Sequence, residues 1–284
     1  MWKRALVGLM LCAPALAHAA EPLPRGLFDL IGPRGLAMGG AVLALGTSND
    51  AIFVNPAGIA QVKRYSTSVQ GLYDFNGGHE SFGSILSDSS ASSLAAGLAY
   101  DRVWEGPAHH QRAANTYHLA LAYNLSSLIV LGATAKVIHY AGNGLLDARV
   151  TPDVGVLVRA TPVNLAFVAY NLVDIHEPDA PRQYAVAVSV AMLYGFNAEA
   201  DVFFDTSTHD QTTLKAQAGV EYQVMPELVL RAGYTEDRIR DQRSASGGVG
   251  VLISQSLFID VGYQHEFLGA RPGRTMMVDL GVNL

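Results

Sequence analysis

Residues 196–205 read FNAEADVFFD, and their side chains alternate in character with a period of two. The even-numbered positions are apolar, whereas most odd-numbered positions carry a carboxylate or an amide. Since successive side chains of a strand point to opposite faces, this pattern predicts a β-strand with one apolar and one polar face. The same alternation returns at 182–192, 215–224 and 278–284.

Fourteen such segments follow one another along the chain. Most have about 9–12 residues, close to the ~9–11 that a tilted membrane strand needs. Tight connections, such as Ser126, Thr161 and Met225, alternate with longer polar ones, of which 104–114 is the longest. This alternation is typical of a barrel with short turns on one side and longer loops on the other. The segments are 64–75, 79–87, 92–103, 115–125, 127–140, 149–160, 162–172, 182–192, 195–205, 213–224, 226–235, 244–253, 256–265 and 274–284.

Hydropathy supports a membrane location for these strands. Half of the residues are hydrophobic and the mean hydropathy is +0.20, yet no apolar run beyond the N-terminus approaches the ~20 residues of a membrane helix. Only helices and closed barrels satisfy their backbone groups in lipid. The sequence therefore predicts an all-β, transmembrane antiparallel barrel of about fourteen strands; a soluble secreted β-sandwich is the alternative.

The N-terminus has the features of a secretory signal peptide. Lys3 and Arg4 precede an apolar stretch over 5–16, and a small-x-small site follows at 17–19. We expect a signal peptide over 1–19 with cleavage near Ala19/Ala20. Without it the chain has 17 basic and 25 acidic residues. An acidic chain without basic clusters argues against binding to nucleic acid.

Residues 20–62 differ from the rest of the chain. The stretch 31–45 is small, apolar and rich in glycine, without sustained alternation, and Asn55-Pro56 marks a turn. An apolar segment before a barrel is poorly suited to water, so we expect it to fold inside the lumen as a plug. The predicted domains are the signal peptide, a plug or hatch over 20–62, and the barrel over 63–284.

Three short motifs in this segment resemble the N-terminal hatch of the FadL-like outer-membrane proteins, closest to the PorV/PorQ type. They lie at 35–41, 49–51 and 55–58. The resemblance implies a fourteen-stranded barrel with an Asn-Pro-Ala motif in its hatch. The hatch-motif residues are Met38, Gly39, Gly40, Asn55, Pro56, Ala57 and Gly58.

The C-terminus resembles the signal that the barrel assembly machinery reads. Its residues are Asp279, Gly281, Val282 and Leu284, with Leu in place of the more usual Phe. We therefore expect a bacterial outer-membrane location with both termini in the periplasm. The expected partners are outer-membrane lipid, the barrel assembly machinery and other envelope proteins.

Strand parity also predicts a charge cluster that faces the lumen. A tight turn through Met225 would set Gly219 opposite Arg231, with Glu221 diagonally beside it. The preceding hairpin would set Asp201 opposite Gln217, so that Arg231 lies near Glu221 and Glu199. Alternatively, these charges simply line a wet interior. The predicted cluster is Glu199, Asp201, Lys215, Glu221 and Arg231.

Catalytic motifs are missing from the sequence. No serine lies in a Gly-x-Ser-x-Gly elbow, and Gly247–Gly250 lacks the helix and lysine of a phosphate loop. His109-His110 fits a solvated loop better than a metal site. We therefore expect no enzyme activity, no metal and no cofactor.

Two functional classes remain open. Short external loops and small or charged inward residues favour a binding or scaffold component of an envelope complex for secretion, surface attachment or motility. Members of the family that the sequence resembles are usually longer, and the resemblance implies large loops that shape their ligand sites. The alternative is a passive transporter of a hydrophobic solute, such as a long-chain fatty acid.

Overall fold

The computed structural model describes residues 31–47, 49–76, 79–105, 112–140, 148–177, 180–191, 193–268 and 273–284. The predicted signal peptide, the first part of the predicted plug (20–30) and the histidine pair at 109–110 lie outside the described residues. Within these ranges, no helix is both long and apolar enough to cross a membrane.

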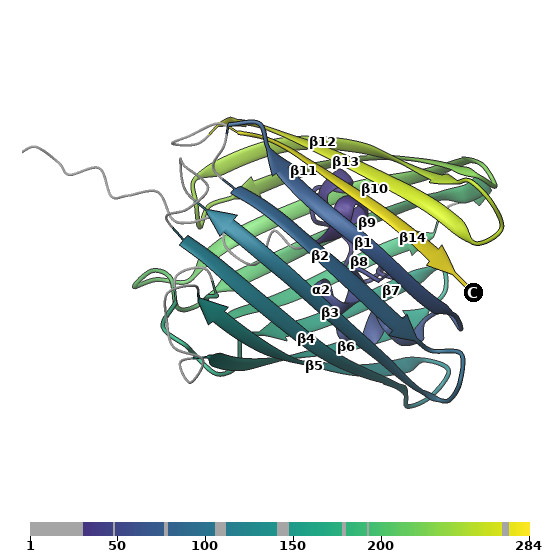
Figure 1. The fold of residues 1–284 in the computed structure, drawn as a ribbon, viewed down its shortest axis with the longest axis horizontal. Helices are drawn as coiled ribbons and strands as arrows, with labels where there is room; N and C mark the ends of the chain where they lie inside the picture. The colour runs from purple at the N-terminus through teal and green to yellow at the C-terminus, as the bar shows by residue number, and fades with distance from the viewer. Residues whose placement is uncertain are drawn as a thin grey trace, which may run out of the picture.

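Fourteen antiparallel strands form a closed barrel in which each strand pairs with its neighbours in sequence and β1 pairs with β14 (Figure 1). This confirms the predicted fourteen-stranded antiparallel barrel. The strands are β1 (Tyr65–Asp74), β2 (His79–Asp88), β3 (Leu94–Glu105), β4 (Arg112–Asn124), β5 (Ile129–Tyr140), β6 (Arg149–Ala160), β7 (Val163–Tyr170), β8 (Gln183–Ala191), β9 (Phe196–Asp205), β10 (Thr213–Met225), β11 (Leu228–Asp237), β12 (Gln242–Leu252), β13 (Leu257–Leu268) and β14 (Arg274–Asn283), with a short 3-10 turn, η4 (Leu193–Gly195), before β9.

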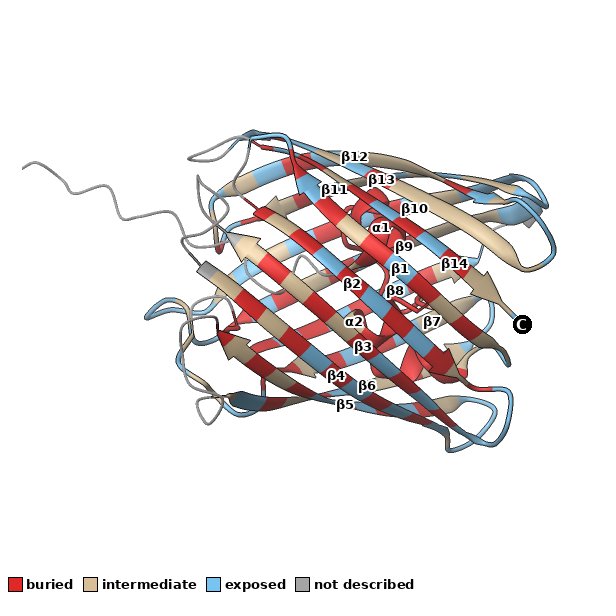
Figure 2. Cartoon of the chain, viewed as in Figure 1, coloured by how far each residue is buried: buried red, intermediate tan, exposed pale blue. Residues whose placement is uncertain are grey.

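Burial alternates along nearly every strand, as the banding in Figure 2 shows. In β4, for example, Tyr117, Leu119 and Leu121 are exposed, whereas Ala120 and Ala122 between and beyond them are buried. The outward face therefore carries large apolar side chains and the inward face small or polar ones. An apolar outer band of this kind is stable against lipid and not against water.

Several strand ends differ from those that the sequence pattern predicted. The link expected over 104–114 is shorter, because β3 continues to Glu105 and β4 begins at Arg112; the longest connection is instead 171–182, between β7 and β8. Polar residues at strand ends continue the ladder where they find cross-strand partners. Glu236 lies opposite Arg243, and their side chains form an ion pair at 3.4 Å.

Three short helices precede the barrel within residues 31–62, which we call the N-terminal segment. They are α1 (Gly32–Ala37), α2 (Ala51–Val54) and η2 (Pro56–Ala60). Helix α1 contacts β11–β14, whereas η2 contacts β3–β6. The main apolar cluster joins buried residues of this segment to inward-facing residues of β2–β9.

Candidate functional site

In the first contact between the N-terminal segment and the barrel, backbone atoms of the segment pack against glycines of two strands. Gly219 and Gly233 lie opposite each other on β10 and β11 and both touch Met38. A Cβ at Gly233 would lie 2.1 Å from the Met38 carbonyl carbon, and one at Gly219 would lie 2.4 Å from its oxygen. Gly39 and Gly40 have φ values of 66° and 86°, which glycine adopts without strain.

The second contact uses the Asn55-Pro56-Ala57 motif. The Asn55 side chain accepts a hydrogen bond from the Ala57 amide at 3.2 Å and donates one to the Leu43 carbonyl at 2.8 Å, so it starts η2 and links both parts of the segment. A Cβ at Gly132 would lie 2.2 Å from the Ala57 nitrogen, and one at Gly155 would lie 2.1 Å from Asn55 Oδ1. The motif therefore packs directly on the strand backbone.

Gly58, the last hatch-motif residue, contacts another part of the N-terminal segment rather than the barrel. A Cβ there would lie 2.2 Å from the Gly46 carbonyl oxygen. A side chain at this position would force two parts of the segment apart, which explains the choice of glycine.

Two buried carboxylates from β9 hold four successive backbone amides. Glu199 accepts from the Ala44 and Leu45 amides at 2.6 and 2.7 Å. Asp201 accepts from the two preceding amides, of Val42 and Leu43, at 3.2 and 3.4 Å. Because carboxylates are strong acceptors in a low-dielectric interior, this pair fixes the path of the segment at 42–45.

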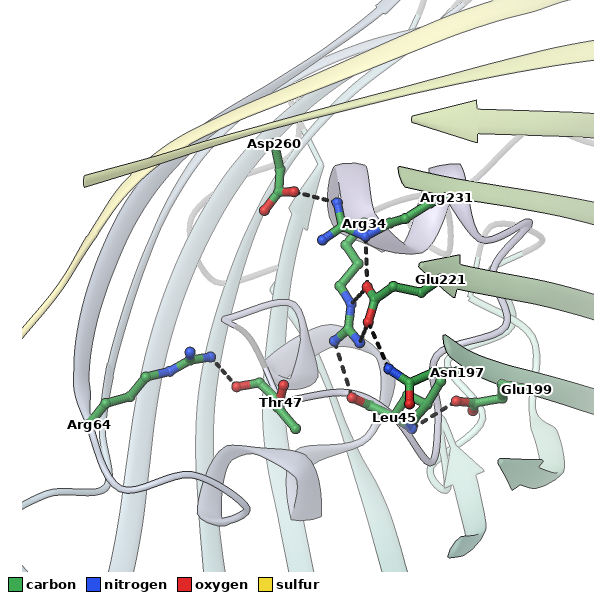
Figure 3. Close-up of polar contacts among 9 residues, drawn as sticks. All are labelled: Arg34, Leu45, Thr47, Arg64, Asn197, Glu199, Glu221, Arg231 and Asp260. Carbon is green, nitrogen blue, oxygen red and sulfur yellow. Dashed lines mark hydrogen bonds and ion pairs between the residues drawn. The ribbon is translucent and has the colours of Figure 1, made fainter. Parts of the chain in front are cut away.

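A chain of four charged side chains ties α1 to the barrel (Figure 3). Arg34 donates to both Glu221 oxygens at 2.9 and 3.2 Å, and Arg231 donates to Glu221 at 2.8 Å and also to Asp260. Burial lowers the pKa of the Arg34 guanidinium, but attraction to Glu221 outweighs it and leaves the pKa above its ordinary value. Arg34 therefore stays charged and paired.

The predicted charge cluster is only partly brought together. Glu221 and Arg231 are direct cross-strand partners, and Gly219 faces Gly233 rather than Arg231. The prediction was wrong by two residues because Met225 pairs with Leu228 across a longer turn.

The other predicted members have different partners. Asp201 lies opposite Gln217, as expected. Glu199 and Asp201 bind segment amides rather than Arg231. Lys215 lies apart, with its Nζ 4.3 Å above the centre of the Phe203 ring.

Sequence reasoning missed Arg34 and Asp260. A single cation in an apolar, glycine-rich stretch is itself a signal, since a buried charge needs a partner. Nothing local identifies that partner, which lies 187 positions away.

The C-terminal residues close the barrel. Asp279 is buried, and a Cβ at Gly281 would lie 2.4 Å from the Phe258 ring. Val282 lies opposite Thr67 of β1 and Leu257 of β13. The backbone of Leu284 exchanges hydrogen bonds with Tyr65, while its side chain is exposed. Recognition by the assembly machinery stays a prediction.

A cavity of about 90 Å³ lies between the N-terminal segment and the strand ends next to the longer connections. Its apolar lining includes Leu36 and Leu43 from the segment and Tyr170 and Phe203 from the barrel. The two rings stack with centroids 5.9 Å apart. Polar side chains complete the lining, among them Lys136, whose Nζ is 2.7 Å from Asp153. The cavity can therefore hold a small, mainly apolar molecule.

Metal-binding side chains do not gather in groups of three or more within the described ranges. The expected lack of enzyme activity and of a cofactor stays a prediction.

The fold class is a closed fourteen-stranded barrel whose N-terminal segment packs on inward-facing residues. Solved structures of similar fold include the toluene transporter TbuX of Ralstonia pickettii, with a TM-score of 0.66 and 13% identity over 90% of this chain and 99% of that chain. The CymD monoaromatic hydrocarbon channel has a TM-score of 0.62 and 12% identity over 89% and 97%. A FadL homologue of Pseudomonas aeruginosa has a TM-score of 0.60 and 14% identity over 89% and 97%.

At these identities the likeness establishes the fold alone. It agrees with the FadL-like resemblance in the sequence, whereas closeness to the PorV/PorQ type stays a prediction. No family model matches the chain. No curated protein matches it in sequence.

Proposed function

We propose that the protein is an outer-membrane channel for a small hydrophobic solute. The observation that carries this proposal is the cavity, where apolar side chains of the segment and the barrel form part of a mixed lining, in a fold whose solved examples include a toluene transporter and a monoaromatic hydrocarbon channel. The transport alternative is thus favoured over the scaffold role that the short loops suggested.

The cavity also limits the size of the solute. About 90 Å³ is well below the ~300–1,000 Å³ of typical pockets for drug-sized ligands. A dry cavity of ~150 Å³ is known to bind benzene. A single aromatic ring therefore fits this site with modest adjustment, whereas a long-chain fatty acid does not.

The N-terminal segment acts in this proposal as a plug in the lumen. Its contacts with β11–β14 on one side and β3–β6 on the other support this role. Both register irregularities among the described strand pairs, at Gln223/Met225 and Arg243/Ser244, lie close to strand ends. Passage through the wall would break backbone hydrogen bonds at a cost of several kcal/mol each in lipid, so the axial route past the segment is favoured.

The apolar outward face and the strand lengths support a location in the outer membrane. Both termini would then lie in the periplasm, on the side of the shorter turns, and the barrel assembly machinery would insert the chain. The protein would act as a passive channel and not as an enzyme.

Uptake by whole cells tests this function. The protein would be expressed in a Gram-negative host without a hydrocarbon channel, and uptake of labelled toluene and of a labelled long-chain fatty acid would be measured. We expect faster toluene uptake, lost in Leu43→Gln at the cavity and kept in the outward-facing control Leu214→Gln. A deletion strain with normal uptake but defective surface machinery would favour the scaffold role instead.

A further inference from the structure

The outward surface of β1–β5 has a hollow among its apolar side chains. These strands are neighbours in the sheet (Figure 1). The hollow has a volume of about 620 Å³. Its floor includes strand backbone, because Ile85, Ala99 and His118 turn their side chains inward, where they are buried. The outward residues that line it are Thr67, Ser84, Leu86, Leu98, Tyr100, Tyr117, Leu119, Ala135 and Val137.

Differences in side-chain size along the sheet form this hollow. Ser84 lies opposite Tyr100, and Ala135 lies opposite Leu119. Since directly opposed side chains on one face of a sheet are neighbours, a small residue beside a large one leaves a depression. Tyr100 and Tyr117 are also cross-strand partners, with ring centroids 5.2 Å apart. The depression is thus bordered by apolar and aromatic groups, which suit an acyl chain.

A polar cluster lies next to the hollow, one cross-strand row nearer to the longer connections. Arg102, Asn115 and His139 are successive partners on β3, β4 and β5. Asn115 Oδ1 accepts hydrogen bonds from the Tyr100 hydroxyl at 3.0 Å and from Arg102 Nη1 at 3.3 Å. The guanidinium carbon of Arg102 lies 5.3 Å from the centre of the Trp104 ring. These contacts hold the cation beside a tyrosine that lines the hollow.

The charge of Arg102 has no carboxylate partner among the described residues. The outward carboxylate Glu80 lies opposite Trp104, and no ion pair joins it to Arg102. A guanidinium has several N–H donors, and Asn115 accepts from one of its nitrogens. A cation on a lipid-facing surface is unfavourable unless water or a lipid headgroup meets it. Arg102 therefore has both charge and donors available for an anion.

We propose that this surface binds a phosphorylated glycolipid of the outer leaflet, with a phosphate on Arg102 and an acyl chain in the hollow. Arginine pairs with phosphate oxygens through parallel N–H donors. Arg102 lies near the end of β3 that leads into the external connection to β4, so it faces the outer leaflet in the orientation given above. The proposal rests on that location and not on the transported solute.

The barrel offers a matched control for each half of this site. Arg274 on β14 is also exposed next to an external connection, with its guanidinium carbon 6.0 Å from the Phe75 ring centre, but it does not line the hollow. Ala245 on β12 is an exposed small residue opposite Tyr234, as Ser84 is opposite Tyr100. Substitutions at these two positions change the lipid-facing surface without changing the proposed site.

Trp104 fluorescence measures binding at the site, because the other tryptophan, Trp2, lies in the predicted signal peptide. The chain from residue 20 onward would be folded in phosphatidylethanolamine nanodiscs with increasing fractions of bisphosphorylated lipid A. We expect Arg102→Gln to raise the binding midpoint about tenfold, and Ser84→Leu, which fills the hollow, to raise it about threefold. Arg274→Gln and Ala245→Leu should stay within about twofold of the unsubstituted protein. Heat modifiability in SDS gels checks that each variant is folded.

Two further probes separate the lipid from its parts. Lipid A without its phosphates should bind about tenfold more weakly, and inorganic phosphate alone should leave the Trp104 emission unchanged. Equal shifts for Arg102→Gln and Arg274→Gln would indicate a general effect of arginines at the membrane surface and would overturn the proposal. Full binding of the dephosphorylated lipid, a response to inorganic phosphate alone, or no response to lipid A would also overturn it. Neither Arg102 nor Ser84 lines the cavity, so failed toluene uptake would count against the proposed function alone.

Discussion

Alanine at position 233 offers a direct test of how the segment contacts the barrel. The added Cβ would lie 2.1 Å from the Met38 carbonyl carbon and 2.2 Å from the Gly39 nitrogen, both backbone atoms that no side-chain rotation can move. The segment must shift by more than 1 Å to restore van der Waals contact, and overpacking of this kind typically costs about 1–3 kcal/mol. Such a shift also lengthens the hydrogen bond from Thr235 to the Gly39 carbonyl.

Gly247→Ala is the matched control on the neighbouring strand. Its nearest atom would be the Arg231 carbonyl oxygen at 3.5 Å, an ordinary contact. Alanine in place of a strand glycine should stabilise this variant by about 0.5–1 kcal/mol, since it restricts the unfolded chain. Unfolding in urea, followed by heat modifiability and tryptophan fluorescence, should separate the two variants by at least about 1.5 kcal/mol. Equal stabilities would refute the close contact between the segment and the barrel.

Three further outcomes follow from contacts described above. Arg231→Ala removes a partner from two half-buried carboxylates, Glu221 and Asp260, and should lower stability by about 1–3 kcal/mol. The outward Leu230→Val should cost under about 1.5 kcal/mol; similar thermal midpoints would contradict the inward placement. Asn55→Ala removes the first-turn acceptor of η2 and should cost about 1–2 kcal/mol, with faster proteolysis within 31–62 as the measurement. Lys136→Met breaks the ion pair with Asp153, so amide exchange in the 171–177 connection should accelerate; unchanged protection would show that the pair does not order this connection.

The strands could be predicted from the sequence because each has a face that must be apolar. Residues 196–205 show this plainly, with small and apolar residues on the outside and Glu199 and Asp201 inside. The register at β10–β11 could not be predicted, since a shift by two residues keeps every side chain on the same face. Only the length of the turn at Pro226 decides between the two registers, and the alternation pattern does not encode it.

The contacts of the segment were harder to foresee for a different reason. Gly132, Gly155 and Gly219 interrupt strand patterns and, taken alone, indicate only weak β-propensity. The structure explains these glycines: the backbone of the N-terminal segment packs directly against them. The segment residues that make this contact are distant from the glycines in sequence. The hatch motifs marked which residues matter in the segment, while the strand residues that receive them carry no comparable local signal.

The position of the N-terminal segment next to β1 has a consequence for biogenesis. β1 and β14 form the seam at which the sheet closes on itself, with partners running from Ser66↔Asn283 to Asp74↔Thr275. The segment enters β1 directly through Arg64, whose side chain reaches back to the Thr47 carbonyl. It is thus tethered beside this seam, and a seam that is still open would let a folded segment enter the barrel from the side. We expect docking to precede seam closure, so that variants with a weakened segment yield sealed, empty barrels rather than unfolded chains.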